Sequence, residues 1–253
     1  MRIRGFAPST PCWVELASAE PGRAQEFYAS LFGWEPSGDR FKLDGRAVAG
    51  LTRTRPGRPA GWLPYLAADD LGAAVQRFAG AGGRCLSGPM DGRGGQGAVV
   101  ADPSGATLGF WQAAGFAGAQ IAGEPGTMAW PELLTDDVAG AEQFYGRTFG
   151  WLLRDSVEWL TQSHDAVAGL APGARTARWR CAFQVADCTA AVSAALDHGA
   201  TLVIAPTDMG VGSIAELLDP WGAPFAVTAP ANHQVELTLS FSAMAGMELT
   251  FGG

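Results

Sequence analysis

The sequence has few charges of either sign and almost no lysine. Only 17% of its 253 residues are charged, and Lys42 is the single lysine. The 17 basic residues are outnumbered by 25 acidic ones, which gives a formal net charge of -8. A protein that holds nucleic acid needs a surplus of basic residues to neutralise phosphates. The composition therefore excludes DNA and RNA as expected partners.

Long apolar runs are also missing. No stretch approaches the ~20 uncharged apolar residues of a membrane-spanning helix, and the N-terminus lacks the apolar run of a secretory signal. The four cysteines form no Cys-x-x-Cys pair, which favours free thiols over a zinc knuckle or a disulfide framework. We therefore expect a cytoplasmic protein with no membrane partner.

The chain contains an internal duplication. The patterns Trp-x-Glu-Leu, Phe-Tyr and Phe-Gly-Trp begin at Trp13 and recur from Trp130, and nine of 22 positions in 13–34 are identical to those in 130–151. The turn Asp-Pro-x-Gly-Ala likewise occurs at 102–106 and at 219–223. The repeat predicts a first domain at 8–113, a linker at 114–127, a second domain at 128–230 and a C-terminal tail at 231–253 that could add a strand.

Each copy shows the same order of predicted elements. In the first copy, a helical period predicts helices at 24–32 and 71–81. Short apolar runs bounded by turn residues predict strands at 13–17, 41–43, 47–51, 63–67, 84–87, 98–101 and 106–112. The sequence therefore predicts an α+β protein in which a βαβββ order is repeated.

This arrangement resembles the vicinal oxygen chelate superfamily of glyoxalase I, bleomycin-resistance proteins and extradiol dioxygenases. The motifs that carry the resemblance occur in register in both copies and span nearly the whole chain. Within the superfamily, the sequence is similar to two-domain glyoxalase-like proteins of actinobacterial type. The resemblance implies tandem domains, each built from two βαβββ modules that form an open curved sheet around a cleft where function resides.

Superfamily enzymes hold a divalent metal with His or Glu at four strand positions. The resemblance places these positions at Trp13, Gly50, near Leu63 and at Gly109 in the first copy, and at Trp130, Gly169, Arg180 or Cys181, and Ala226 in the second. A divalent metal needs several converging nitrogen, oxygen or sulfur ligands. These positions supply almost none, so we expect no metal and no other cofactor. This disfavours a metal-dependent glyoxalase or dioxygenase.

Glu15 and Glu132 are the candidate catalytic residues. Each follows a tryptophan by two positions on a predicted strand, so both side chains share one face. The resemblance implies that this face lines the cleft, where a carboxylate could serve as a general base or as a hydrogen-bond partner of a ligand. The alternative is a solvated carboxylate or a structural ion pair with an arginine such as Arg180.

Aromatic residues supply the candidate ligand-binding set. Flat aromatic walls suit a planar apolar molecule, and several aromatic positions recur at or beside strand positions that the resemblance assigns to the cleft. His164, just before a strand of the second copy, could face the cleft or be solvated. The predicted ligand-binding residues are Trp13, Trp62, Tyr65, Phe110, Trp130, His164 and Trp179.

Two functions remain open at this point. Metal-independent binding of a small apolar or aromatic molecule, as in sequestration of a drug or metabolite, needs only walls and a few polar anchors. The alternative is a metal-independent isomerase, lyase, cyclase or hydroxylase-type tailoring enzyme that uses a cleft glutamate as base. Tandem copies can complete in one chain what single-domain relatives build by pairing, so we expect a monomer, with a dimer through the tail as the alternative.

Overall fold

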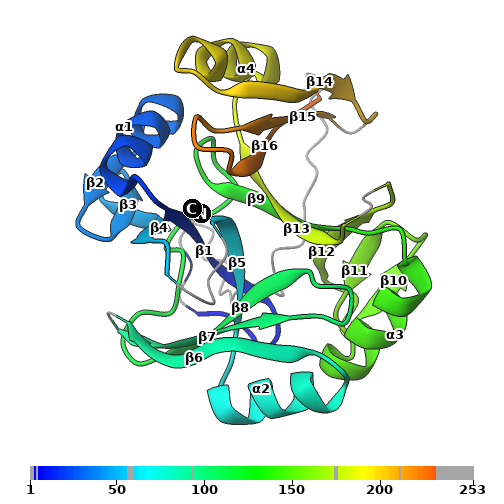
Figure 1. Ribbon diagram of the computed structural model, residues 1–253. Coiled ribbons are helices and arrows are strands. Elements are labelled where there is room, and N and C mark those ends of the chain that lie inside the picture. The colour runs from blue at the N-terminus through cyan, green and yellow to red at the C-terminus, as the bar shows by residue number, and fades with distance from the viewer. Residues whose placement is uncertain are drawn as a thin grey trace, which may run out of the picture.

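The computed structural model describes residues 3, 5–55, 60–92, 94–173, 176–210 and 212–231. These residues form two mixed eight-stranded sheets, one from each half of the chain (Figure 1). The first half contains β1 (Pro11–Ser18), α1 (Pro21–Phe32), β2 (Glu35–Ser37), β3 (Arg40–Leu43), β4 (Arg46–Arg53), β5 (Gly61–Ala67), α2 (Leu71–Gly80), β6 (Arg84–Gly92), β7 (Gly95–Ala101) and β8 (Thr107–Ala113). The second contains β9 (Met128–Leu134), α3 (Val138–Phe149), β10 (Leu152–Arg154), β11 (Glu158–Leu160), β12 (Ala166–Ala171), β13 (Arg178–Gln184), α4 (Cys188–Asp197), β14 (Thr201–Asp208), β15 (Gly212–Leu218) and β16 (Pro224–Pro230).

The two sheets have the same topology. The strand order is β2-β3-β4-β1-β5-β8-β7-β6 in the first and β10-β11-β12-β9-β13-β16-β15-β14 in the second. In each sheet, two βαβββ modules meet through an antiparallel pair, β1 with β5 and β9 with β13. The predicted α+β class and the duplicated modules are confirmed. The expected strand in the tail lies outside the described residues.

Helix ends follow from the local sequence. The carboxylates of Asp70, Asp137 and Asp187 each accept a hydrogen bond from the backbone N–H three residues later, which caps α2, α3 and α4. Helices α1 and α3 end at Gly33 and Gly150, whose φ angles of 68° and 70° are strained for any residue with a Cβ. Within the described residues, no helix has the length and apolarity to cross a membrane.

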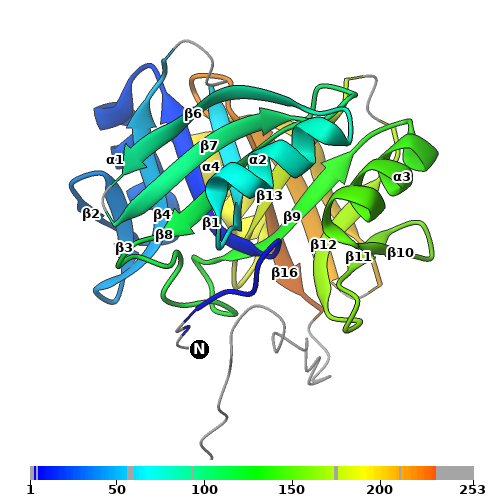
Figure 2. The same ribbon diagram turned by 90° about the horizontal axis from the view of Figure 1, so that it is seen from below.

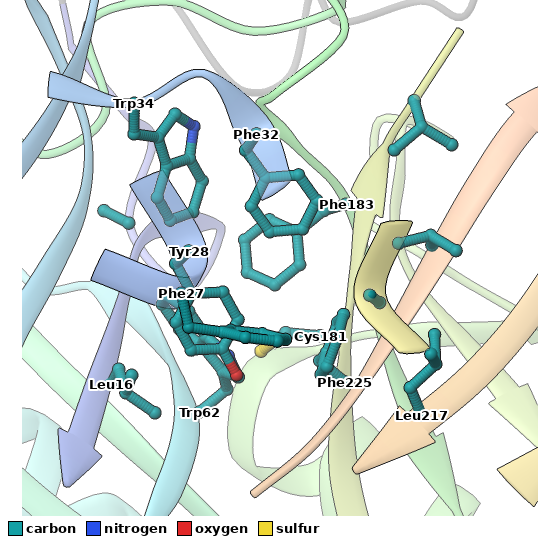
Figure 3. Close-up of a cluster of buried hydrophobic side chains, with 14 of the residues drawn as sticks. Leu16, Phe27, Tyr28, Phe32, Trp34, Trp62, Cys181, Phe183, Leu217 and Phe225 are labelled. Carbon is teal, nitrogen blue, oxygen red and sulfur yellow. The ribbon is translucent and has the colours of Figure 1, made fainter. Parts of the chain in front are cut away.

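The two larger hydrophobic cores are each shared between the two halves of the chain, and a smaller third cluster lies within the first half. In one core, Phe32 of α1 lies 5.0 Å from Phe183 of β13, measured between ring centroids, and Phe27 contacts Phe225 of β16 (Figure 3). The other core is built in the same way, because Phe144 of α3 contacts Phe78 of α2 at 4.9 Å. The first module of each half therefore packs against the second module of the other half.

The ribbon views show the same packing of modules across the two halves. Helix α2 lies across β6 and β7 of its own half and beside α3 of the other half (Figure 2). Helices α1 and α4 form the equivalent pair (Figure 1). With the helical face of each sheet covered in this way, the opposite face is left to form a cleft.

Candidate functional site

A cleft with a volume of about 210 Å³ lies over the first sheet. Strands β1, β3, β4, β5, β6, β7 and β8 contribute to it, together with the segment that connects the two halves. Its lining combines aromatic rings with charged side chains. The residues are Trp13, Glu15, Asp39, Arg40, Gly50, Leu51, Thr52, Arg55, Tyr65, Met90, Asp91, Gly92, Gly97, Trp111 and Phe116.

Trp13 and Tyr65 face each other across the β1/β5 pair and form the base of the aromatic wall. Tyr65 is also the partner of Gly109 on β8. A Cβ at Gly109 would lie 2.3 Å from the tyrosine ring, so only glycine leaves room for this ring position. Gly109, which the resemblance to the superfamily places at a metal-ligand position, therefore leaves room for the ring of Tyr65 in the aromatic wall.

Glu15 lies beside Trp13 over the backbone of Gly50. A Cβ at Gly50 would approach the Glu15 Cγ to 2.7 Å and the Trp13 Nε1 to 2.9 Å. This close approach again requires glycine, and it brings the carboxylate and the indole to the same part of the cleft. The structure thus joins Trp13, Glu15 and Tyr65, which the sequence analysis had selected, in one site.

Several cleft residues were not predicted from the sequence, among them Trp111, Phe116 and Arg40. Phe116 belongs to the connecting segment and meets Trp13 edge to face, with ring centroids 4.9 Å apart. Its carbonyl oxygen accepts a hydrogen bond of 2.8 Å from Trp111 Nε1, and the Arg40 guanidinium lies 3.6 Å from its ring centroid. A single large aromatic residue in a Gly- and Ala-rich segment is the signal that could have revealed Phe116.

The interpretation of Trp62, Trp179 and Phe110 as cleft residues is wrong. Successive side chains of a strand point to opposite faces. Trp62 lies three positions from Tyr65, and Phe110 lies one position from Trp111, so neither shares a face with these cleft residues. Trp179 is the equivalent of Trp62 in the second copy. Trp62 contacts Tyr28 in one core, and Phe110 contacts Phe78 in the other. Trp179 donates a hydrogen bond of 3.1 Å to the Tyr145 hydroxyl and is equally buried.

His164 lies away from the cleft. It occupies a turn between β11 and β12 with a φ of 66°, and its side chain is exposed. Its backbone N–H donates a hydrogen bond of 2.9 Å to the carbonyl of Thr161. The solvated alternative for this histidine is the observed one.

In the second sheet, Glu132 takes part in a partly buried network of ion pairs. Its carboxylate pairs with Arg180, and Arg180 Nη1 also lies 2.6 Å from a carboxylate oxygen of Glu216. Arg178 pairs with the other oxygen of Glu216 at 2.6 Å. Burial alone would lower the pKa of Arg180, but the two glutamates raise it above its ordinary value. The structural ion pair, weighed earlier as an alternative for Glu132, is therefore present.

The two copies differ at the positions that surround the conserved glutamate. Leu63 and Val99 of the first sheet are replaced by Arg180 and Glu216 at the equivalent positions of the second. The walls change as well, because Ala182 and Thr228 stand where the first copy has Tyr65 and Trp111. Trp130, half-buried, is retained beside Gly169. The aromatic cleft is thus a feature of the first copy.

The positions expected to hold a metal do not fit one. The third position was expected near Leu63 and at Arg180, but by strand pairing it is two residues further on. Tyr65 lies opposite both Trp13 and Gly109, and its equivalent Ala182 lies opposite Trp130 and Ala226. Neither set contains a histidine or a carboxylate. Across the described ranges, no group of three His, Cys, Asp or Glu side chains could hold a metal ion. Cys181, the other candidate, is buried in a hydrophobic core, where desolvation raises the pKa of its thiol.

These features define a tandem protein of the vicinal oxygen chelate fold. A family model described as "Glyoxalase-like domain" matches residues 13–110 and again 131–228, and the chain belongs to this family. It is 36% identical over 257 residues to the anthracycline biosynthesis protein DauV of Streptomyces sp. strain C5, an alignment that covers 88% of this chain and 94% of the relative. It is 35% identical to the putative glyoxylase CFP32 of Mycobacterium bovis, with 90% and 98% covered.

Solved structures show the same fold at low sequence identity. The Mn(II)-bound glyoxalase from Novosphingobium aromaticivorans has a TM-score of 0.63 and 18% identity, with 90% of this chain and 82% of that chain covered. Homoprotocatechuate 2,3-dioxygenase from Arthrobacter globiformis has a TM-score of 0.60 and 15% identity, with 96% and 89% covered. At these identities the likeness concerns the fold alone.

Proposed function

We propose that the first-copy cleft binds a small planar aromatic molecule without the help of a metal. The observation that carries this proposal is the aromatic wall of Trp13, Tyr65, Trp111 and Phe116, which lines the cleft together with the carboxylate of Glu15. Stacked and edge-to-face aromatic contacts stabilise a planar ligand beyond the area they bury. The names of the Streptomyces relatives support an aromatic ligand, because anthracyclines are polycyclic aromatic compounds.

The size of the cleft narrows the ligand class. Its volume of about 210 Å³ is below the ~300 to 1,000 Å³ typical of sites for drug-sized ligands. One or two fused rings fit such a space, whereas a four-ring skeleton could enter only in part. We therefore propose a one- or two-ring aromatic compound, or the terminal rings of a larger one, as the bound group.

The test is a titration of the full chain with 1-naphthol, in which binding is measured by calorimetry and by tryptophan fluorescence. Trp13→Ala should weaken binding by more than ~1 kcal/mol, because an aromatic contact in a desolvated site is lost. Trp130→Ala, the same change at the duplicated position, is the matched control and should leave the affinity unchanged. Equal effects of the two substitutions, with both variants folded, would contradict the assignment of the site.

A second function, proton transfer by Glu15, is favoured by one observation. Glu15 lines the aromatic cleft beside Trp13, and its duplicate Glu132 lies in the second sheet, outside that cleft. A carboxylate next to a bound ketone could remove an α-proton to give the enolate. An isomerase then protonates the enolate at another carbon and a cyclase adds it to a second carbonyl, whereas protonation at the original carbon gives hydrogen exchange. Such an enzyme would be metal-independent, like the binding protein.

Hydrogen exchange distinguishes the two functions without knowledge of the natural substrate. An enzyme should catalyse incorporation of deuterium from D₂O at the α-carbon of 1-tetralone, a two-ring ketone, as measured by NMR. Glu15→Gln should then slow the exchange by roughly two to four orders of magnitude with little change in affinity, and Glu132→Gln should have no effect. Tight binding with no exchange above the solvent rate would leave binding as the function.

We also propose that the protein acts in the cytoplasm as a monomer. Its four cysteines are free thiols, which is typical of a reducing compartment. The helical face of each half is covered by the other half, so the apolar surface that a single domain would bury against a second chain is already used. Light scattering should give the mass of one chain. A dimer that dissociates when residues 232–253 are deleted would overturn this proposal.

A further inference from the structure

We propose that Phe116, which is carried by the segment between the two halves, sets the upper size limit of the ligand. This inference rests on the proposed aromatic binding site and adds a residue that determines its specificity. Phe116 is the one cleft-lining residue among those described that comes from outside the first sheet and its loops. Its ring lies against those of Trp13 and Trp111, so a ligand that extends along this aromatic wall meets it.

The backbone of Phe116 is fixed by hydrogen bonds to the β6/β7 turn. The N–H groups of Ala114 and Phe116 both donate to the carbonyl of Gly94, at 2.7 and 3.0 Å. The carbonyl of Phe116 accepts from Trp111 Nε1 at 2.8 Å. Gly94 has a φ of 93°, and a Cβ there would lie 2.6 Å from the Phe116 Cβ, so this contact requires glycine.

The ring of Phe116 is held as firmly as its backbone. Trp13 meets it at an interplanar angle of 87°, and Trp111 at 74° with centroids 6.3 Å apart. The Arg40 guanidinium lies 3.6 Å from its centroid, a distance at which a cation is attracted to the ring face. The ring of Phe116 is therefore a rigid wall, because moving it would break its contacts with Trp13, Trp111 and Arg40.

Removing this wall should lengthen the cleft by about one ring. Phe116→Ala deletes a phenyl group while the hydrogen bonds of its backbone remain possible, so the connecting segment should keep its path. A three-ring ligand that is too long for the cleft of about 210 Å³ should then fit. A two-ring ligand should lose a contact and bind more weakly.

The experiment compares two probes, 1-naphthol with two rings and 1-hydroxyanthraquinone with three, by calorimetry on the full chain. For Phe116→Ala, the affinity for the two-ring probe should fall by roughly five- to tenfold, and that for the three-ring probe should rise by a similar factor. Phe116→Trp, which enlarges the wall, should shift the preference in the opposite direction. A merely structural role would weaken both probes together.

Trp221→Ala is the matched control. Trp221 is also a half-buried aromatic residue that stacks with an arginine, Arg23 at 5.6 Å, but it lies on the turn between β15 and β16, outside the cleft. It should leave the ratio of the two dissociation constants unchanged. An unchanged ratio in both Phe116 variants, with 1-naphthol still bound by the wild type, would overturn the size limit while the proposed site stands. Failure of the wild type and every variant to bind either probe would overturn both.

Discussion

Tyr28 of α1 donates a hydrogen bond of 3.1 Å to Asp219, which lies 191 positions away in the other half of the chain. Asp219 begins the Asp-Pro-x-Gly-Ala turn, and its other carboxylate oxygen accepts from the backbone N–H groups of Trp221 and Ala223. The duplication repeats the contact in reverse, since Tyr145 donates to Asp102 at 2.9 Å. The two motifs that reveal the duplication in the sequence therefore join the halves in space.

Removing one of these tyrosine hydroxyls should destabilise the protein. Tyr28→Phe leaves a carboxylate oxygen of the buried Asp219 without its donor, which should cost ~1 to 3 kcal/mol of the free energy of unfolding. Tyr145→Phe should cost a similar amount and, because it lies in the other core, the two losses should add. Urea denaturation of both single variants and the double variant measures this. No loss in either variant would mean that the contact contributes nothing to stability.

Stability should fall above pH ~9 to 10. Burial, followed by the charge of the neighbouring aspartate, raises the pKa of Tyr28 and of Tyr145 well above the ordinary value of 10.0. Burial also raises the pKa of the Cys12 and Cys181 thiols above 9.0. All four groups have a higher pKa in the folded state, so the folded state keeps protons that the unfolded state loses as the pH rises through its own lower pKa values.

The tyrosine contribution can be isolated. A Tyr28→Phe/Tyr145→Phe variant retains the cysteines but has no phenol to ionise at these sites, so its stability should decline less steeply above pH ~10 than that of the wild type. Thermal unfolding between pH 7 and 11 gives the two slopes. Equal slopes would show that these tyrosines have the same pKa in the folded and the unfolded protein.

The ion pairs of the second sheet should fix which side chains contact one another, but they should add little to the net free energy of unfolding. Arg180→Leu leaves the 3% exposed Glu216 with one arginine fewer and removes the partner of Glu132, so it should cost ~3 to 5 kcal/mol. Adding Glu216→Val should recover most of that loss. The first sheet is the natural control, because it carries Leu63 and Val99 at these positions and folds in the same way.

Chemical denaturation of the single and double variants measures this recovery. Arg178, whose side chain is 37% exposed, can turn to solvent once Glu216 is gone. A double variant no more stable than Arg180→Leu alone would show that the charges themselves are needed in the second sheet.

The chain should unfold in one cooperative transition despite its two copies. The two larger cores are shared, since Phe32 packs on Phe183 and Phe78 on Phe144 across the halves, and only a small cluster lies within the first half. Separation of the halves would expose both cores at once. Near-ultraviolet circular dichroism and tryptophan fluorescence should therefore give coincident denaturation curves. Two separate transitions would contradict this dependence.

Purified protein should take up less than one divalent metal per chain at the superfamily's strand positions. Trp13, Gly50, Tyr65 and Gly109 offer no imidazole or carboxylate there, and Trp130, Gly169, Ala182 and Ala226 offer none either. Elemental analysis after dialysis against Zn²⁺ or Mn²⁺ tests this. One metal per chain that resists further dialysis, and whose removal abolishes ligand binding, would contradict it.

The sequence by itself determined the fold. Its spaced motifs at Trp13 and Trp130 repeat in register, and residues that recur at strand and helix periods specify the same modules twice. It also predicted that Trp13 and Glu15 share a face, because residues two apart on a strand always do. It could not place Trp62 or Phe110, since a one-residue change in register moves a strand side chain to the opposite face.

Only the tertiary structure showed which residues line the aromatic cleft of the first copy. Glu15 and Glu132 are equivalent in the sequence, and their surroundings depend on the residues that the neighbouring strand places opposite them, Leu63 for Glu15 and Arg180 for Glu132. Phe116 lies in a segment with no periodic pattern, so its role depends on the path of the connection across the first sheet. The packing of each module against a module of the other half could not be read from the sequence either. The sequence of a helix shows which of its faces is apolar but not which sheet will cover that face.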